Sequence, residues 1–306
     1  MTDLPFFSIA RHMKPERSAP VKSSHRRHPI LEAFGVALRE PWTIACLAVL
    51  AAFVFIALFA GFFAGDPQAI NPAQRLKPPS ANAWWGTDHL GRDVFARAMY
   101  GTRMSLTIGL SVAVITVLPG VALGVIAGLT KFGGTVVMRI IDAMMAIPAV
   151  LLAIALAALL QPGMLTVIIA ISIPEIPRMV RLVRSVVLSI REQPYMDAAI
   201  SVGTRGLPLV FRHVLPNTVA PVIVQATYAA ASAIIASAIL SFLGVGTPPD
   251  VPSWGGMMAD ARKYFQFYPS LMAYPGLLLS LLVLVTNVLG DRLSDVLDPR
   301  KSTRRI

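Results

Sequence analysis

The sequence predicts an all-α polytopic membrane protein with six transmembrane helices. Of its 306 residues, 55% are hydrophobic and only 14% are charged, whereas a soluble domain carries about a quarter charged residues. Uncharged runs recur along the chain, separated by polar and basic stretches. Several of these runs are long enough to cross the hydrocarbon core of a bilayer as a helix.

The chain starts with a basic segment, residues 1–42, in which seven Lys and Arg side chains precede the first apolar run. We expect a mostly disordered tail that ends in an interfacial segment from Pro29 to Trp42. A cleavable signal peptide has a shorter charged region and a shorter apolar core, which disfavours that alternative. The first transmembrane helix is predicted at residues 43–63, because these 21 residues carry no charge.

A polar, Pro-rich external segment, residues 64–103, separates the first helix from a five-helix core at residues 104–290. The core begins with an uncharged run at residues 104–129 that contains Pro119. A transmembrane helix tolerates such a proline when neighbouring groups satisfy the freed carbonyl. The third span is predicted as one helix over residues 136–160, after a tight connection.

The third span contains two charged residues near its start. Arg139 and Asp142 are one helical turn apart, and residues at this spacing are neighbours on a helix surface. We expect them to form an ion pair where the helix enters the membrane, with a kink at Pro148. A turn at residues 161–163 leads to the next span.

The fourth span has the shortest uncharged run, about ten residues from Met164. We expect one kinked helix that leaves the bilayer as a basic amphipathic stretch, with Arg178, Arg181 and Arg184 along one face.

The last two spans are predicted at residues 218–245 and 270–290, and a tail of residues 291–306 ends the chain. The fifth span is dense in Ala and Ser between Ala226 and Ala238. Such small residues let helices pack closely in lipid.

The distribution of basic residues predicts the orientation. Six spans place both termini on one side, and the tails and connections of that side carry 20 of the 27 Lys and Arg residues. The positive-inside rule therefore predicts cytoplasmic termini. The basic residues do not form one patch with interleaved aromatics, so the net charge of +11 does not indicate a nucleic-acid partner.

The longest polar connection in the second half of the chain, residues 190–217, contains Asp-Ala-Ala at residues 197–199, followed by Gly203. Alanine favours a short helix, and its small side chain lets another protein approach the backbone closely. Gly203 is placed to end that helix, and Pro216 stands where the next long helix begins. We expect a compact, basic surface element between two membrane helices.

This pattern of an acidic residue, Ala-Ala, Gly and Leu-Pro at fixed gaps resembles the EAA loop of ABC-transporter permeases. The chain has Asp197 where the family usually has Glu, and His213 where it usually has Ile. In that family the loop forms a coupling helix that docks into a groove of the ATP-hydrolysing subunit. The resemblance therefore assigns coupling to the ATPase to Asp197, Ala198, Ala199, Gly203 and Arg205.

An external stretch, residues 84–101, reads WWGTDHLGRDVFARAMYG and contains Asp88, His89 and Asp93. Carboxylate and imidazole groups are usable metal ligands, but nothing in the sequence fixes their mutual geometry, and we predict no metal site. The glycines suit turns, and Asp88 is expected to cap the helix that leads into the second span.

The same stretch resembles the GTD-x-x-GRD-V segment of the dipeptide/oligopeptide (peptide/nickel) permeases. Residues 240–262, with PSWG, and residues 287–300, which end in LDPR, are similar to other parts of that subfamily. The resemblance covers residues 29–300 and implies an ATP-driven importer of peptides or similar small solutes. Dipeptides, oligopeptides, glutathione and nickel all stay open as solutes.

The resemblance also implies the partners. A second, related permease would complete the pore, two ATP-binding cassette ATPase subunits would dock from the cytoplasm, and an extracytoplasmic solute-binding protein would deliver the solute at a bacterial inner membrane. The chain lacks a G-x-x-x-x-G-K-[ST] phosphate loop, so we expect no ATP hydrolysis by it and no cofactor. No Ser/His/Asp or Cys/His set suggests catalysis.

A self-sufficient secondary transporter or channel is the alternative. Such transporters commonly carry buried ionisable residues near the bilayer midplane. The uncharged cores of the first, second, fifth and sixth spans argue against it, and Glu175 is the only acidic candidate in the fourth. Co-purification with an ATPase would separate the two classes.

Overall fold

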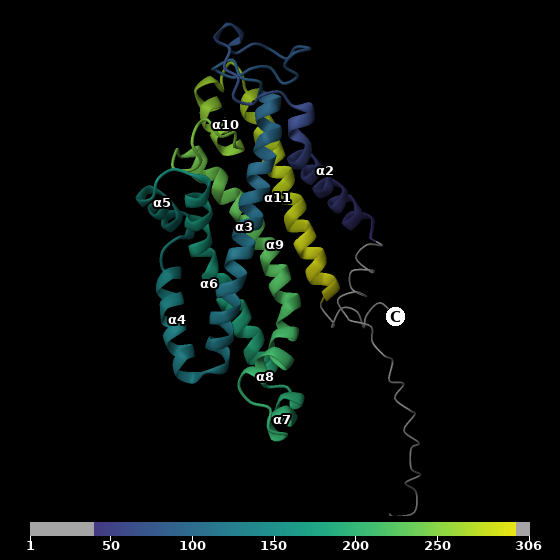
Figure 1. The fold of residues 1–306 in the computed structure, drawn as a ribbon, viewed down its shortest axis with the longest axis vertical. Helices are drawn as coiled ribbons and strands as arrows, with labels where there is room; N and C mark the ends of the chain where they lie inside the picture. Colours follow the sequence, from purple (N-terminus) through teal and green to yellow (C-terminus); the bar gives the residue numbers. More distant parts are fainter. Residues whose placement is uncertain (1–39, 298–306) are drawn as a thin grey trace, which may run out of the picture.

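The computed structural model describes residues 40–297 as an elongated helical bundle (Figure 1). The predictions for residues 1–39 and 298–306 lie outside the described residues. The elements in chain order are α2 (Pro41–Phe63), η1 (Pro72–Gln74), α3 (Val94–Leu129), α4 (Lys131–Met145), α5 (Ala149–Leu159), α6 (Met164–Arg191), α7 (Pro194–Ser201), α8 (Leu207–Leu209), η2 (Val210–Val214), α9 (Leu215–Phe242), α10 (Trp254–Ala261), η3 (Arg262–Tyr264) and α11 (Ser270–Leu297).

Four helical segments are long and apolar enough to cross a membrane: α2, α3, the stretch Leu207–Phe242 and α11. Helices α4 and α5 together make a fifth candidate. Within residues 40–297 the remaining regular structure is helical too, apart from two isolated β-bridges. The all-α membrane fold is therefore confirmed, with four to five candidate spans.

Helix α3 is longer than the predicted second span, because it starts at Val94, inside the segment that was predicted to be external. The side chain of Asp93 caps it by accepting a hydrogen bond from the Phe95 N–H at 2.9 Å. The prediction that Asp88 caps this helix was therefore wrong. Asp88 instead accepts hydrogen bonds from the backbone of Leu90 and Arg92 in the preceding loop.

The prediction of one helix for the third span was also wrong. Helices α4 and α5 are bent by 85° relative to each other at the break before Ala149. Pro148 has no N–H to continue the helical ladder, and the residue before a proline is biased away from helical angles. The expected tight connection at residues 131–134 is already helical, as the first turn of α4.

Close packing of α3 against α6 builds the centre of the bundle. Gly120, Gly124 and Gly128 recur every four residues and so lie on one face of α3. A Cβ atom added at Gly124 would lie 2.5 Å from Cβ of Val183, and one at Gly128 would lie 2.6 Å from Cγ1 of Val187. Small residues of this kind allow the two backbones to approach closely.

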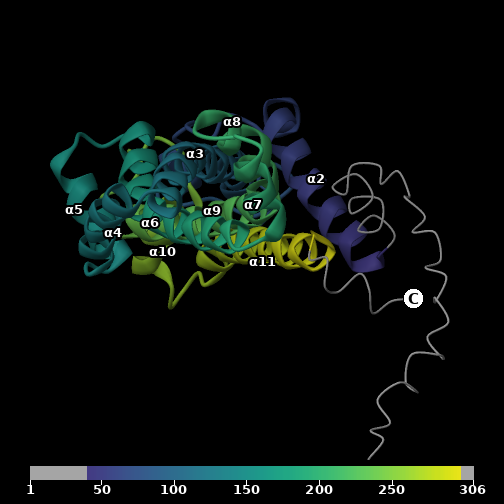
Figure 2. The ribbon, with the colours of Figure 1, turned by 90° about the horizontal axis from the view of Figure 1, so that it is seen from below.

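The two ends of the bundle carry different structures. The loop before α3 and helix α10 lie together at one end, and α7 and α8 lie at the other (Figure 1). Figure 2 views the bundle from the end of α7 and α8, with α4 and α5 on one side and α2 on the opposite side. An ion pair at 3.3 Å joins Arg292 of α11 to Glu40 before α2, so the two ends of the described chain are close together.

Candidate functional site

The connection between α6 and α9 forms the candidate site, at the end of the bundle marked by α7 and α8 (Figure 1). Pro194 occupies the first turn of α7, where its missing N–H costs nothing. Met196 is only 1% exposed and belongs to a buried cluster with Val187 of α6 and Val214 before α9. One apolar side chain therefore anchors α7 to both long helices that flank it.

The end of α7 is closed around Gly203, as the sequence predicts. The Gly203 N–H donates to the carbonyl of Ile200 at 2.9 Å, and the Thr204 N–H donates to that of Ala199 at 3.0 Å. These two bonds form a Schellman motif. Gly203 has φ +95°, a left-handed conformation that glycine adopts without strain.

The residues assigned to coupling all lie in this one element. Asp197, Ala198, Gly203 and Arg205 are exposed, and Ala199 is half-buried. No heavy atom lies within 4 Å of a Cβ built at Gly203. The structure therefore presents the predicted residues to solvent as one short helix and its C-terminal turn.

An exposed apolar surface accompanies these residues and was not predicted. Val202, Leu207 and Phe211 are 87%, 70% and 65% exposed. Their apolar character is visible in the sequence, but Met196 and Val214 of the same connection are apolar and buried, so composition alone does not identify the exposed residues. Val202 precedes the candidate span Leu207–Phe242, whereas Leu207 and Phe211 lie in its first turns. Exposed apolar patches of this kind mark contacts with another protein or with the membrane.

Further contacts fix the connection to the bundle. Arg191, at the end of α6, donates to the carbonyl oxygen of Gly128 on α3 at 2.7 Å. Asn217 at the start of α9 donates to the carbonyl oxygen of His213 at 2.7 Å and to the hydroxyl of Tyr195 on α7 at 3.4 Å. One of these bonds therefore ties the end of α6 to α3, and another ties α7 to the start of α9.

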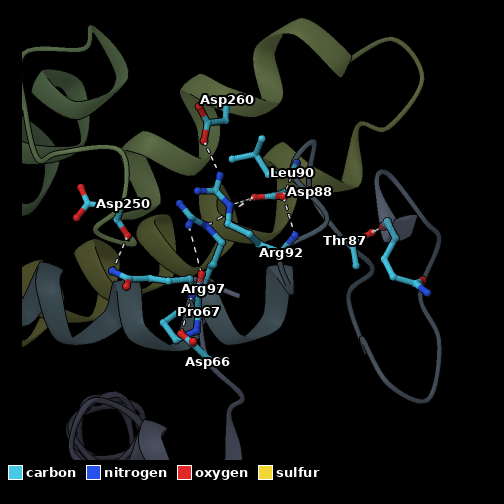
Figure 3. Close-up of polar contacts among 11 residues, drawn as sticks. Asp66, Pro67, Thr87, Asp88, Leu90, Arg92, Arg97, Asp250 and Asp260 are labelled. Carbon is cyan, nitrogen blue, oxygen red and sulfur yellow. Dashed lines mark hydrogen bonds and ion pairs between the residues drawn. The ribbon is translucent and has the colours of Figure 1, made fainter. Parts of the chain in front are cut away.

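At the opposite end, a polar network joins the loop before α3 to α10 (Figure 3). Arg92 Nε pairs with Asp88 Oδ2 at 2.6 Å and its Nη2 pairs with Asp260 at 3.3 Å. Arg97 Nε lies 3.8 Å from the same Asp88 oxygen, and its Nη1 donates to the Pro67 carbonyl at 3.4 Å. Both guanidinium groups are buried.

Asp88 and Asp93, two of the residues considered above as metal ligands, have other partners in the structure. The carboxylate of Asp88 is engaged by two guanidinium groups, and that of Asp93 caps α3. Burial raises the pKa of Asp93 above its ordinary value, and the bonds that it accepts from backbone N–H groups oppose this shift. Within residues 40–297 no group of three or more His, Cys, Asp or Glu side chains has metal-site geometry.

A third polar cluster lies inside the bundle, and the sequence did not predict its partners. Glu175 on α6 is buried and accepts hydrogen bonds from Arg178 at 2.9 and 3.2 Å and from Ser232 of α9 at 2.8 Å. The expected pair of Arg139 and Asp142 is not formed. Asp142 instead pairs with Arg181 of α6 at 2.7 Å.

The comparisons of this chain with a family model and with known proteins agree on one family. A family model described as the inner membrane component of binding-protein-dependent transport systems matches residues 120–303. A probable peptide ABC transporter permease protein of Sinorhizobium fredii is 47% identical over 88% of this chain and 93% of its own length. A dipeptide transport system permease protein of Alkalihalophilus pseudofirmus is 40% identical over 94% of this chain and 96% of its own length.

The solved structures give the same fold at lower identity. A chain of the MetNI methionine ABC transporter in an inward-facing conformation superposes with a TM-score of 0.56 at 18% identity, covering 66% of this chain and 96% of that one. At this identity the likeness concerns the fold alone.

Proposed function

The chain belongs to the family of binding-protein-dependent transport system inner membrane components, and from this premise we propose that it imports peptides. It is the permease component of an ABC transporter and is not itself an ATPase. Relatives whose names specify peptide or dipeptide transport match it at 40% identity or more along most of their length. Di- and oligopeptides are the proposed solutes. An inner-membrane importer of this kind works with an ATPase and a binding protein.

The observation that carries the proposed mechanism is the exposed helix α7. Its solvent-facing residues, its closed C-terminal turn and the adjacent apolar surface of Val202, Leu207 and Phe211 suit docking into a groove of an ATPase subunit. Docking makes Met196 the mechanical link, because this side chain joins α7 to the cluster between α6 and α9.

The proposed topology has six transmembrane helices, with α6 as the fourth. Helix α6 is 28 residues long, about 42 Å at 1.5 Å per residue, which exceeds the thickness of the hydrocarbon core. Both termini and α7 then lie in the cytoplasm. The segment of residues 64–103 and helix α10 lie outside, where the binding protein arrives.

The proposed assembly contains two permeases and two ATPase subunits. Closure of the ATPase pair on ATP displaces α7, and α6 and α9 move with it because the Met196 cluster holds all three together. Rocking of these helices exchanges outward and inward access to the path between the permeases. No residue of this chain takes part in covalent chemistry.

Peptide uptake into proteoliposomes tests the proposal. The two permeases, the ATPase subunits and the binding protein are reconstituted, and uptake of a radiolabelled dipeptide is measured with and without ATP. We expect uptake that requires both ATP and the binding protein. Uptake by this chain alone, or no uptake of any di- or oligopeptide by the complete complex, contradicts the proposal.

A further inference from the structure

Arg178 is an exposed cation in the middle of α6, the helix that we propose above as the fourth span. It is the fifteenth of the 28 residues of α6, which places it about 20 Å from either end at 1.5 Å per residue. Its side chain is 47% exposed, whereas that of its partner Glu175 is 5% exposed. A guanidinium group at this depth is costly against hydrocarbon, so this face of α6 is turned toward protein or water.

The guanidinium group is held on one side only. All hydrogen bonds of Arg178 in the described structure go through Nη1, to both oxygens of Glu175 and to Ser232 Oγ at 3.5 Å. Nη2 and Nε have no partner among residues 40–297. They form the planar pair of donors that binds a carboxylate through two parallel hydrogen bonds.

The charges around Arg178 favour an anion. Arg178, Arg181 and Arg184 follow one another on α6, and the ion pairs described for them use only two carboxylates, those of Glu175 and Asp142. The Nε of Arg184 is buried without a hydrogen-bond partner in the described structure. This part of α6 therefore carries one positive charge more than its neighbours neutralise.

We propose that Arg178 lines the translocation path and binds the C-terminal carboxylate of the peptide in transit. Glu175 and Ser232 are positioning residues, because they hold Nη1 and leave the other two donor nitrogens facing the path. This inference rests on the proposed function as a peptide permease. It adds a recognition step inside the membrane to the selection made by the binding protein.

Uptake of a matched pair of peptides tests this inference. The pair is one tripeptide with a free C-terminus and the same tripeptide as its C-terminal amide, chosen so that both bind the binding protein, as measured on that protein alone. Uptake rates are compared at saturating loaded binding protein in proteoliposomes of the complete importer. Wild type should transport the free acid about tenfold faster, which corresponds to one charge-assisted hydrogen-bonded pair.

The variants separate recognition from structure. Arg178→Gln should lower uptake of the acid to the rate of the amide, whereas Arg178→Lys should restore part of the preference for the acid. Arg181 provides the matched control, because its guanidinium group is already paired with Asp142. The variant Arg181→Gln should keep the preference for the acid. The double variant Glu175→Gln/Arg178→Gln removes the buried carboxylate together with its partner and serves as the test if the single variant does not assemble.

Two results overturn the inference. One is equal loss of acid and amide uptake in Arg178→Gln with ATPase stimulation by the loaded binding protein intact, and the other is an unchanged preference. Failure of the wild-type complex to import either peptide is a different result, since it refutes the proposed function and the inference with it.

Discussion

The N–H of Thr204 donates to the carbonyl oxygen of Ala199 at 3.0 Å and closes helix α7 across Gly203. This bond determines where the exposed helix stops and where the apolar surface of Val202, Leu207 and Phe211 begins. The geometry requires the positive φ of Gly203, so the shape of the proposed docking element depends on one backbone conformation.

Gly203→Val should weaken docking of the ATPase. Valine is β-branched and has no space problem here, because nothing lies within 4 Å of a Cβ at this position. It is strained by the backbone alone, at a cost on the order of 1–3 kcal/mol. We expect normal membrane abundance and a roughly tenfold or greater loss of ATPase association, measured by co-purification. Gly203→Asn is the matched control, because asparagine tolerates left-handed angles; equal behaviour of the two variants argues against this explanation.

Met196 and Val202 should differ in what they control. Met196→Ala leaves a cavity in the cluster between α6 and α9 and should lower stability by about 2–5 kcal/mol. Val202→Asp changes an exposed side chain and should alter stability by less than about 0.5 kcal/mol, yet it should abolish ATPase co-purification. Thermal unfolding in detergent and co-purification are measured for both. A Val202→Asp variant that still binds the ATPase at wild-type level would show that the apolar surface does not take part in docking.

Asp88 should be required for the stability of the end opposite α7. Asp88→Asn leaves two buried guanidinium groups, those of Arg92 and Arg97, without their shared carboxylate. Removing one partner of a buried ion pair costs about 3–5 kcal/mol. We expect a lower unfolding temperature of the purified chain. Asp250→Asn, at an exposed residue of the same end, should leave the temperature unchanged, and a similar loss in both variants would show that the network is not the cause.

The proposed orientation predicts a labelling pattern for engineered cysteines. In a Cys46→Ser background, Ser80→Cys should react with a membrane-impermeant thiol reagent in cells with a permeabilised outer barrier. Thr204→Cys should react only after the inner membrane is opened. Ser80 belongs to the loop before α3 and Thr204 directly follows α7, and these two segments lie at opposite ends of the bundle (Figure 1). The reverse pattern would invert the topology and place α7 on the wrong side for an ATPase.

Local sequence was sufficient for α7. Two alanines and a glycine at the correct distance each act over a few residues, and each has the conformation expected of it. The start of the next helix was predicted too late, because the helical stretch begins at Leu207, before Pro216. The long apolar helices were predicted for a similar reason, since the requirement for uninterrupted apolar sequence in lipid depends on composition.

The local sequence was not sufficient to predict which prolines interrupt a helix or which residues form ion pairs. Pro119 and Pro174 lie inside continuous helices, whereas Pro148 separates two. Neighbouring helices can satisfy a carbonyl that proline leaves free, and these neighbours are distant in sequence. The same holds for Asp142, which is one turn from Arg139 but pairs with Arg181, 39 residues away.

Cross-linking from α7 tests the central claim most directly. A photoreactive amino acid replaces Ala198, on the exposed helix, or Ser80, at the other end of the bundle, and membranes containing the complete importer are irradiated. We expect a covalent adduct with the ATPase subunit from position 198 and none from position 80. An ATPase adduct from position 80, or none from position 198 in a complex that still hydrolyses ATP on solute binding, would contradict it.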